Sequence, residues 1–426
     1  MHRVGFWVCA AMVFASMVGT GVFTSLGFQV GPLPSPFVIL ALWAAGGLIA
    51  LCGALSYAEL AAALPRSGGE YHFLGRIFHP AVGLMAGFVS VFVGFSAPIA
   101  LGAIAFGRYV EAAVPELPQG KAAFVIVLAL AGIHGVTMRM SGGFQIFATA
   151  FKASLVVGFL VVGWILAPGA NFAPRPGDAA LIGSGSFAVS LMFVLYAYSG
   201  WNAAVYIAGE VRDPGRVLPR ALCVATLAVT ILYVGLNAMF LASAPMGVFA
   251  GKVEVGEVAA RHLFGAGGGR WMSIIIGLGL VSSLSALTFA GPRVAQVAGE
   301  DFAALSWLAG KSRGGVPLRA LAMQTAIVIL LLGLATFEEV LISAQFALIA
   351  CSSLTVIGLF VLRVREPLLT RPFRCPGYPW VPAIFLLTAL FTLGHALLTR
   401  PAEALAGMIT LASGLVLYFA VGRRLR

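Results

Sequence analysis

Two short groups of glycine and hydroxyl residues interrupt long apolar segments of this chain. They are Ser16-Met17-Val18-Gly19-Thr20-Gly21-Val22-Phe23 and Tyr196-Ala197-Tyr198-Ser199-Gly200-Trp201-Asn202. A glycine in a helix interior costs about 1 kcal/mol relative to alanine, and inside a bilayer the freed backbone groups have no water to bond. We therefore expect a broken helix at each group, with a small polar or zwitterionic ligand on the freed backbone.

The ends of two broken helices suit a ligand that carries both a carboxylate and an ammonium. The N-terminus of a half-helix offers NH groups and positive dipole to the carboxylate, and a C-terminus offers carbonyls to the ammonium. An amino acid carries both groups. The alternative is that the glycines only allow helices to pack closely. The recurrence of the pattern in the first and sixth apolar segments favours a binding site.

Lys152 lies at the centre of another apolar segment, residues 147–155. A lysine at that depth costs about 3 kcal/mol unless it is paired or hydrated. The middle of the predicted spans offers no acidic partner, so we expect carbonyls of the first break and a hydroxyl of Ser282, Ser283 or Ser285 to hold the ammonium. Snorkelling to an interface is the alternative, and the long apolar stretches on both sides of Lys152 disfavour it.

The composition indicates a helical membrane protein. Of 426 residues, 60% are hydrophobic and 10% are charged, with a mean hydropathy of +1.01, whereas soluble domains are about 25% charged. The basic residues are scattered in short loops, which argues against a nucleic-acid site despite the net charge of +11. The five cysteines share no metal-type spacing, so we expect neither a zinc site nor a disulfide framework. No metal or cofactor site is expected.

We expect one all-α, polytopic membrane domain of twelve spans and no soluble domain. The predicted spans are residues 4–30, 36–63, 82–110, 121–138, 143–166, 186–210, 218–243, 271–298, 318–335, 339–362, 379–398 and 403–421.

The lysines and arginines predict the orientation of the spans. Of the 26 basic residues, 18 fall in loops on the side of the N-terminus, 7 fall on the opposite side, and Lys152 lies within a span. Because basic loops stay in the cytoplasm, both termini are predicted to be cytoplasmic. A multi-pass protein of the cell (inner) membrane follows.

The spacing of the two interruptions predicts an inverted repeat. They fall in spans one and six, five spans apart, and an odd number of spans inverts the second unit in the membrane. Paired interruptions at corresponding positions are a sequence sign of a transporter site. We expect a first repeat over residues 1–166, a second over residues 186–362, and two further spans over residues 379–421.

Three motifs in order along the chain carry a resemblance to a known family. They are Val18-Gly19-Thr20-Gly21-Val22-Phe23; Ser56-Tyr57-Ala58-Glu59-Leu60 running to Leu64-Pro65-Arg66-Ser67-Gly68-Gly69-Glu70-Tyr71; and Tyr198-Ser199-Gly200-Trp201-Asn202 running to Gly209-Glu210-Val211-Arg212-Asp213-Pro214-Gly215-Arg216-Val217-Leu218-Pro219-Arg220-Ala221. The chain resembles the amino acid–polyamine–organocation (APC) superfamily, closest to its L-type amino acid transporter-like branch. The resemblance implies a LeuT-type fold of five-plus-five inverted repeats and two C-terminal helices.

The resemblance also implies a substrate site. Its residues here are Val18, Gly19, Thr20, Gly21, Tyr196, Ala197, Tyr198, Ser199 and Gly200. Tyr196 matches the aromatic position that gates the substrate in the family; an ordinary core aromatic is the alternative.

Lys152 resembles a built-in cation in relatives that do not use sodium. In that role its ammonium replaces the sodium ion and, with Ser282 and Ser283, braces span one against span eight. Desolvation favours the neutral amine, so release and rebinding of a proton is a second hypothesis. The sequence leaves both open.

The loop after span two resembles the family's cytoplasmic loop helix. Arg66, Glu70 and Arg76 there are expected to form an inner gate, exchanging ion pairs with Glu210 or Arg212. The alternative is a solvated loop held near lipid headgroups.

These observations predict a sodium-independent secondary transporter of neutral amino acids that works by alternating access, through exchange or proton coupling. The absence of an acidic residue at mid-span argues against cationic substrates, and the engagement of Lys152 argues against acidic ones. The alternatives are a carrier of polyamines or other organic amines, and a substrate-sensing receptor on the same fold; nothing at mid-span suggests an enzyme. No cysteine lies in an outside loop near span three or four, so no disulfide-linked partner subunit is expected.

Overall fold

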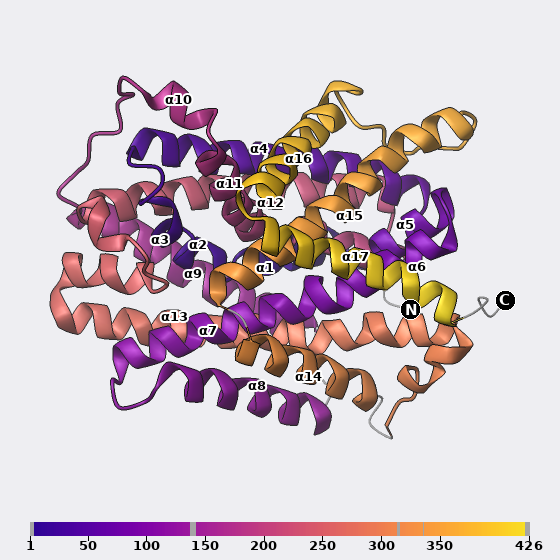
Figure 1. Cartoon of the computed structure of the whole chain (residues 1–426), viewed down its shortest axis with the longest axis horizontal. Helices are drawn as coiled ribbons and strands as arrows, with labels where there is room; N and C mark the ends of the chain where they lie inside the picture. The colour runs from indigo at the N-terminus through magenta and orange to yellow at the C-terminus, as the bar shows by residue number, and fades with distance from the viewer. Residues whose placement is uncertain (1–3, 137–141, 313–315, 335, 422–426) are drawn as a thin grey trace.

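The computed structural model describes residues 4–136, 142–312, 316–334 and 336–421. The chain folds into long helices that run mostly along one axis of the molecule (Figure 1). The described residues contain no β-sheet, only a bridge between Val4 and Val211. This all-helical architecture fits a bilayer, where a helix satisfies its own backbone groups.

The elements follow the apolar segments of the sequence. In chain order they are α1 (Phe6–Met17), α2 (Gly21–Thr24), α3 (Leu26–Gln29), α4 (Pro36–Ala63), α5 (Gly69–Ile77), α6 (Pro80–Val89), the π-helical turn η1 (Ser90–Ser96), α7 (Ala97–Ala113), α8 (Gln119–Val136), α9 (Gly142–Leu166), α10 (Asp178–Ile182), α11 (Gly185–Tyr198), the 3₁₀ helix η2 (Ala203–Glu210), α12 (Pro214–Ser243), η3 (Met246–Phe249), α13 (Val255–Asp301), η4 (Ala303–Leu308), α14 (Leu318–Leu334), α15 (Phe337–Arg365), α16 (Trp380–Thr399) and α17 (Pro401–Val421).

Each of the twelve predicted spans overlaps one of these helices or a run of two or three of them. Residues 137–138 of the fourth span and 335 of the ninth lie outside the described residues. In the part of the chain that is described, ten helical segments are long and apolar enough to cross a membrane, and two shorter apolar helices cover Gln119–Gly135 and Leu318–Gly333. A multi-pass helical protein is therefore confirmed. The count of twelve crossings and the repeat boundaries stay predictions.

Several of the predicted spans, and the long helix α13, are interrupted rather than straight. The third consists of α6 and α7 joined by η1. Within α13, Gly265 has a φ of 75°, which divides a short helix from the long one that follows. That short helix begins at Val255. The first and sixth spans are broken at the glycine groups, as described below.

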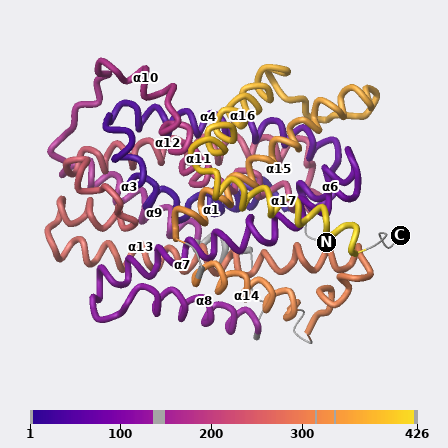
Figure 2. The backbone as a smooth tube through the Cα atoms, viewed as in Figure 1, coloured from indigo at the N-terminus to yellow at the C-terminus, as the bar shows by residue number. Residues whose placement is uncertain are grey.

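The helices form two packed groups. In one group, α12 packs extensively against α4 and also against α1, and α4 contacts α11. In the other, α7 packs against α13 and α8, while α14 contacts α8 and α13. Figure 2 shows α8 and α14 side by side along one edge of the molecule, next to α7 and α13. The first and sixth spans belong to the group of α4 and α12, and α2 of the first span also contacts α13.

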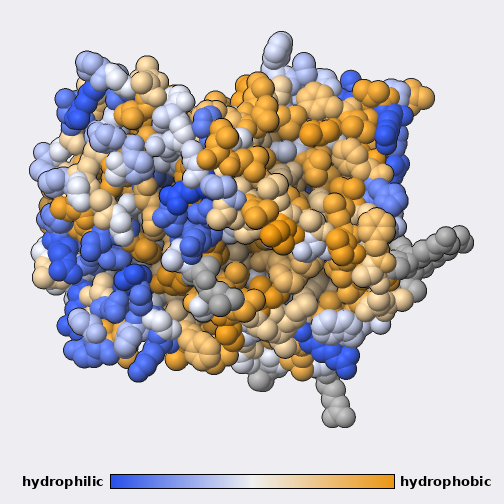
Figure 3. All heavy atoms as spheres, in the orientation of Figure 1, coloured by the Kyte–Doolittle hydropathy of each residue, from blue (hydrophilic) through white to orange (hydrophobic). Residues whose placement is uncertain are grey.

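The surface has the polarity that a bilayer requires. Apolar side chains cover most of the middle of the face in Figure 3, and polar side chains gather toward its left end. Ile231, Leu390 and Phe419, on three different helices, are at least 68% exposed, as expected for side chains that face lipid. Several arginines used to predict the orientation lie outside the described residues, namely Arg3, Arg139, Arg313, Arg423, Arg424 and Arg426.

Candidate functional site

Both glycine groups break their helices. The first helix, α1, ends at Met17, and Val18 leaves helical geometry with φ −74° and ψ 90°. The chain resumes as α2 at Gly21 and continues into α3 through Ser25, which is itself helical. The other helix, α11, ends at Tyr198, and Gly200 has a φ of 99°, a conformation that favours glycine.

The two breaks lie against each other. A Cβ added to Gly21 would lie 2.4 Å from Ala197 Cα, and one added to Gly200 would lie 2.8 Å from the backbone of Ser16. Glycine is therefore required on each side so that the two backbones can approach. This mutual packing brings the broken ends of the first and sixth spans to a single place in the bundle.

A tyrosine from the seventh span connects the breaks. The hydroxyl of Tyr233, on α12, lies 2.6 Å from the carbonyl oxygen of Met17 and 3.2 Å from that of Ala197. Tyr233 is fully buried. Tyr233 was not among the residues predicted from the sequence. The only signal was a phenol in the middle of an apolar span, where a buried hydroxyl needs a partner.

Lys152 lies behind the first break and is 8% exposed. Its ammonium donates to the carbonyl oxygens of Ala15, at 3.3 Å, and Val18, and it lies 3.0 Å from the hydroxyl oxygen of Ser283. An ammonium has three hydrogens, so these three oxygens satisfy it. Lys152 thus joins α1 to α13, the helices of the first and eighth spans.

The other two candidate serines do not bond Lys152. Ser285 instead lies 2.8 Å from Nε2 of His134, on α8, whereas Ser282 lines the cavity described next. Successive residues of a helix point about 100° apart, so one serine of this group, Ser283, faces α9 while its neighbours face elsewhere. Of the three hydroxyls, the helix geometry selects one.

A cavity of about 830 Å³ adjoins both breaks. Seven of the nine predicted substrate residues line it: Gly19, Thr20, Gly21, Tyr196, Ala197, Ser199 and Gly200. Val18 instead turns its carbonyl to Lys152. The side chain of Tyr198 points into the bundle, where its hydroxyl donates to the carbonyl of Trp43 at 3.1 Å. These two residues are therefore not in the cavity wall.

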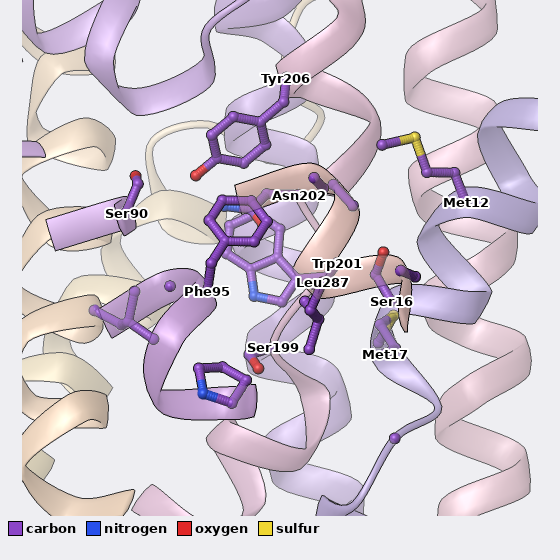
Figure 4. Close-up of a pocket in the computed structure, with 18 of the residues that line it drawn as sticks. Met12, Ser16, Met17, Ser90, Phe95, Ser199, Trp201, Asn202, Tyr206 and Leu287 are labelled. Carbon is purple, nitrogen blue, oxygen red and sulfur yellow. The ribbon is translucent and has the colours of Figure 1, made fainter. Parts of the chain in front are cut away.

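The cavity wall includes residues that the sequence analysis did not assign to it. Figure 4 shows Ser90 and Phe95 of η1 on one side of Trp201 and Asn202, with Ser16 on the other side. Ser90 and Phe95 belong to a π-helical turn, a feature common at functional sites. A π turn leaves no simple pattern in a single sequence, which is why these residues were missed.

Tyr196 lies at the wall of the cavity beside the first break. Its hydroxyl is 3.1 Å from that of Thr20, and the side chain is 5% exposed. Phe28 stacks against Phe193 and Phe337, and these rings belong to the same apolar cluster as Tyr196. From the breaks, the cavity extends past Tyr206 to Glu70, Arg293 and Lys311, at the end of the bundle where α5 lies.

The predicted ion pairs of the inner gate are not formed in this conformation. Among the described residues, no salt bridge joins Arg66, Glu70 or Arg76 to Glu210 or Arg212. Arg76 pairs with Glu366 at 2.8 Å, at the end of α15.

Glu70 is buried at 3% exposure and accepts hydrogen bonds from the hydroxyls of Tyr57 and Ser352. In this conformation α5 turns the Glu70 carboxylate inward, away from the arginines, and the inner gate stays a prediction. Glu210 is exposed at the end of η2 and lines the cavity.

The model of the family described as amino acid permease matches residues 4–419 of the chain. The chain belongs to the amino acid permease family. The matched residues include the broken spans, Lys152 and the cavity wall. The match confirms the resemblance to the APC superfamily.

Curated relatives match over nearly the whole chain. The b(0,+)-type amino acid transporter 1 of Mus musculus is 27% identical over 98% of this chain and 87% of its own length. The cystine/glutamate transporter of Homo sapiens is 26% identical, over 96% and 83%. The serine/threonine exchanger SteT of Bacillus subtilis (strain 168) is 24% identical, over 99% and 97%.

The family and its members define the class of activity. The permease is an amino acid transporter of the membrane, and the family and the named relatives are transporters rather than enzymes. The helical bundle with paired broken spans is consistent with the LeuT-type architecture of this superfamily.

Proposed function

We propose that this permease is a sodium-independent secondary transporter of neutral amino acids, working by alternating access with the substrate at the two breaks. The observation that carries the proposal is the contact of the breaks, where Gly21 meets Ala197 and Gly200 meets Ser16 beside the cavity. The start of α2 offers backbone NH groups to a carboxylate. The ends of α1 and α11 offer carbonyls to an ammonium.

The contacts of Lys152 support independence from sodium. Its ammonium, held by the carbonyls of Ala15 and Val18 and by the hydroxyl of Ser283, occupies a cation position between the first and eighth spans. Carbonyl and hydroxyl oxygens are the ligands that a sodium ion would use. A fixed ammonium there braces α1 against α13 without a bound ion.

The chemistry of the breaks supports neutral substrates. The Lys152 ammonium already contacts three oxygen atoms, so it is not free to pair with the acidic side chain of a substrate. The described residues at the two breaks carry no carboxylate that would pair with a cationic one. Relatives named for different substrates, serine and threonine for one and cystine and glutamate for another, indicate that family membership alone does not decide the substrate.

The shape of the cavity supports an inward-facing state. The Tyr196–Thr20 contact covers the breaks on one side, and the cavity extends toward α5, which the basic loops assign to the cytoplasm. We therefore propose a cell-membrane protein with both termini cytoplasmic.

We further propose that the carrier needs no disulfide-linked partner subunit. Four of its five cysteines are buried and Cys223 is partly buried, and a cysteine within the bundle is not available to an external partner.

Uptake by purified protein in proteoliposomes tests the proposal. We expect saturable uptake of neutral amino acids that is the same with sodium or with choline outside, and faster when the vesicles hold unlabelled substrate. Preference for polyamines would favour the organic-amine carrier instead. Saturable binding without flux would favour a receptor, and a sodium requirement would refute the role given to Lys152.

A further inference from the structure

Glu70 is a buried carboxyl group at the wall of the cavity, outside the substrate breaks. It lies in the first turn of α5 and is 3% exposed. Among the described residues it forms no salt bridge. A buried carboxylate without a cationic partner is costly, so its presence at a cavity calls for an explanation beyond packing.

The two oxygens of Glu70 have different surroundings. Oε1 accepts from the hydroxyl of Tyr57, at 2.5 Å, and from that of Ser352, at 3.0 Å. None of the described residues donates a hydrogen bond to Oε2. This oxygen is nevertheless not fully enclosed by protein atoms. Because Glu70 lines the cavity, Oε2 is the atom open to it. The carboxyl is thus anchored by one oxygen and accessible at the other.

The groups that face Glu70 are uncharged at neutral pH. They are Tyr57 on α4, Cys351 and Ser352 on α15, and Tyr206 on η2. The charged side chains of the same cavity, apart from Lys152 at the first break, are Glu210, Arg293 and Lys311. Desolvation by these neutral surroundings raises the pKa of the Glu70 carboxyl above its ordinary value of 4.5, and the two hydroxyl donors oppose the rise only in part.

The position of Glu70 is linked to the second break. The turn before α5 is hydrogen-bonded to η2, through Gly68 N to Tyr206 O at 3.1 Å and through Gly209 N to Ser67 Oγ at 3.2 Å. Gly69, with a φ of 54°, lets this turn approach the Tyr206 ring, which a Cβ would meet at 2.7 Å. The second half of the sixth span therefore cannot move without moving the Glu70 carboxyl or breaking these bonds.

We propose that Glu70 is a proton-binding site that couples proton uptake to closure of the cavity on the α5 side. A proton from the cavity binds at Oε2 and neutralises the carboxylate. Closure brings Oε2 out of contact with water, and only the neutral acid tolerates that enclosure. Because linkage is reciprocal, protonation favours closure and closure favours protonation. This inference rests on the proposed alternating access and adds the coupled ion.

Net uptake in proteoliposomes between pH 5.5 and 8 tests the proposal. In the wild type we expect uptake to fall as the pH rises, approaching about tenfold per pH unit above the pKa of the site, and a pH gradient to drive accumulation. Glu70→Gln, permanently neutral, should show a flat profile and no response to the gradient. Glu70→Asp should keep a profile, displaced along the pH axis. Glu300→Gln, which removes an exposed carboxylate outside the cavity, should behave as the wild type.

A second measurement does not depend on transport. Since the folded state binds the Glu70 proton more tightly than the unfolded state, the melting temperature should decline as the pH rises from about 4.5 through the raised pKa. Glu70→Gln should lack this part of the decline, and Glu300→Gln should keep it.

The proposal is overturned if Glu70→Gln keeps the wild-type uptake profile, or if its melting temperature follows the same pH dependence as that of the wild type. A wild type that moves no amino acid would refute the proposed function, and the melting curves would still decide whether Glu70 binds the proton.

Discussion

The hydroxyls of Thr20 and Tyr196 lie 3.1 Å apart and join the two broken spans across 176 residues of sequence. The contact places the Tyr196 ring beside the first break, where it lines the cavity. A hydrogen bond of this kind contributes about 1 kcal/mol net, while the ring itself excludes water. The two contributions can be separated by substitution.

Tyr196→Phe removes the hydroxyl and keeps the ring. We expect a KM change of about fivefold or less and little loss of maximal uptake. Tyr196→Ala removes the cover as well, and uptake should fall much further. Equal effects of the two substitutions in a labelled-substrate assay would contradict a gating role for the ring.

Lys152→Ala should reduce uptake at least about tenfold at every pH from 5 to 8, because each lost charged hydrogen bond is worth about 1.5–3 kcal/mol. Lys152→Arg keeps the charge with a different shape and should retain part of the activity. If Lys152 instead carries a proton, the alanine variant will lose the pH dependence of any remaining uptake. Unchanged transport with an unchanged pH profile would exclude both roles.

Gly21→Ala should destabilise the protein by about 1–3 kcal/mol and abolish uptake. The added methyl would lie 2.4 Å from the backbone of Ala197, and backbone cannot turn aside as a side chain can. The matched control is Gly132→Ala on α8, where the added methyl meets no atom within 4 Å. Melting temperature and uptake of both variants provide the comparison, and similar behaviour would argue against a required contact of the breaks.

Tyr233→Phe should raise KM with a smaller effect on folding. The hydroxyl lies near the carbonyls of Met17 and Ala197, so its loss loosens the relative position of the two breaks while the ring still fills its site. Substrate concentration curves measured for exchange would reveal the change. A wild-type KM would show that the hydroxyl does not position the breaks.

Glu59→Gln should lower the free energy of unfolding by about 3 kcal/mol. Glu59 is 1% exposed; its carboxylate binds Arg363 at 2.9 and 2.6 Å and the Cys375 backbone NH at 2.6 Å, with Arg371 at 3.4 Å. The control is Glu366→Gln, which breaks the exposed pair with Arg76 and should cost no more than about 1 kcal/mol. Chemical denaturation of both variants checks the difference, and equal losses would contradict it.

The sequence by itself determined the elements and the positions of the two helix breaks. Apolar runs decide where a helix crosses a bilayer, which is why α4 covers the predicted residues 36–63. Glycines beside hydroxyl residues indicate where a helix breaks. A lone lysine in an apolar run requires oxygen partners. All of these features depend on local composition. The motifs that indicate the permease family are themselves short local segments.

Only the tertiary structure decided which side chains meet. In the folded chain Lys152 contacts Ser283 and not Ser285. The hydroxyl of Tyr233 lies near carbonyls of both breaks. The side chain of Tyr198 points away from the cavity. The tertiary structure also turned Glu70 toward Tyr57 and Ser352 rather than toward the arginines. These outcomes depend on the rotation and depth of helices packed against one another. No single segment encodes that relation, because each helix satisfies its own backbone and leaves its orientation to its neighbours.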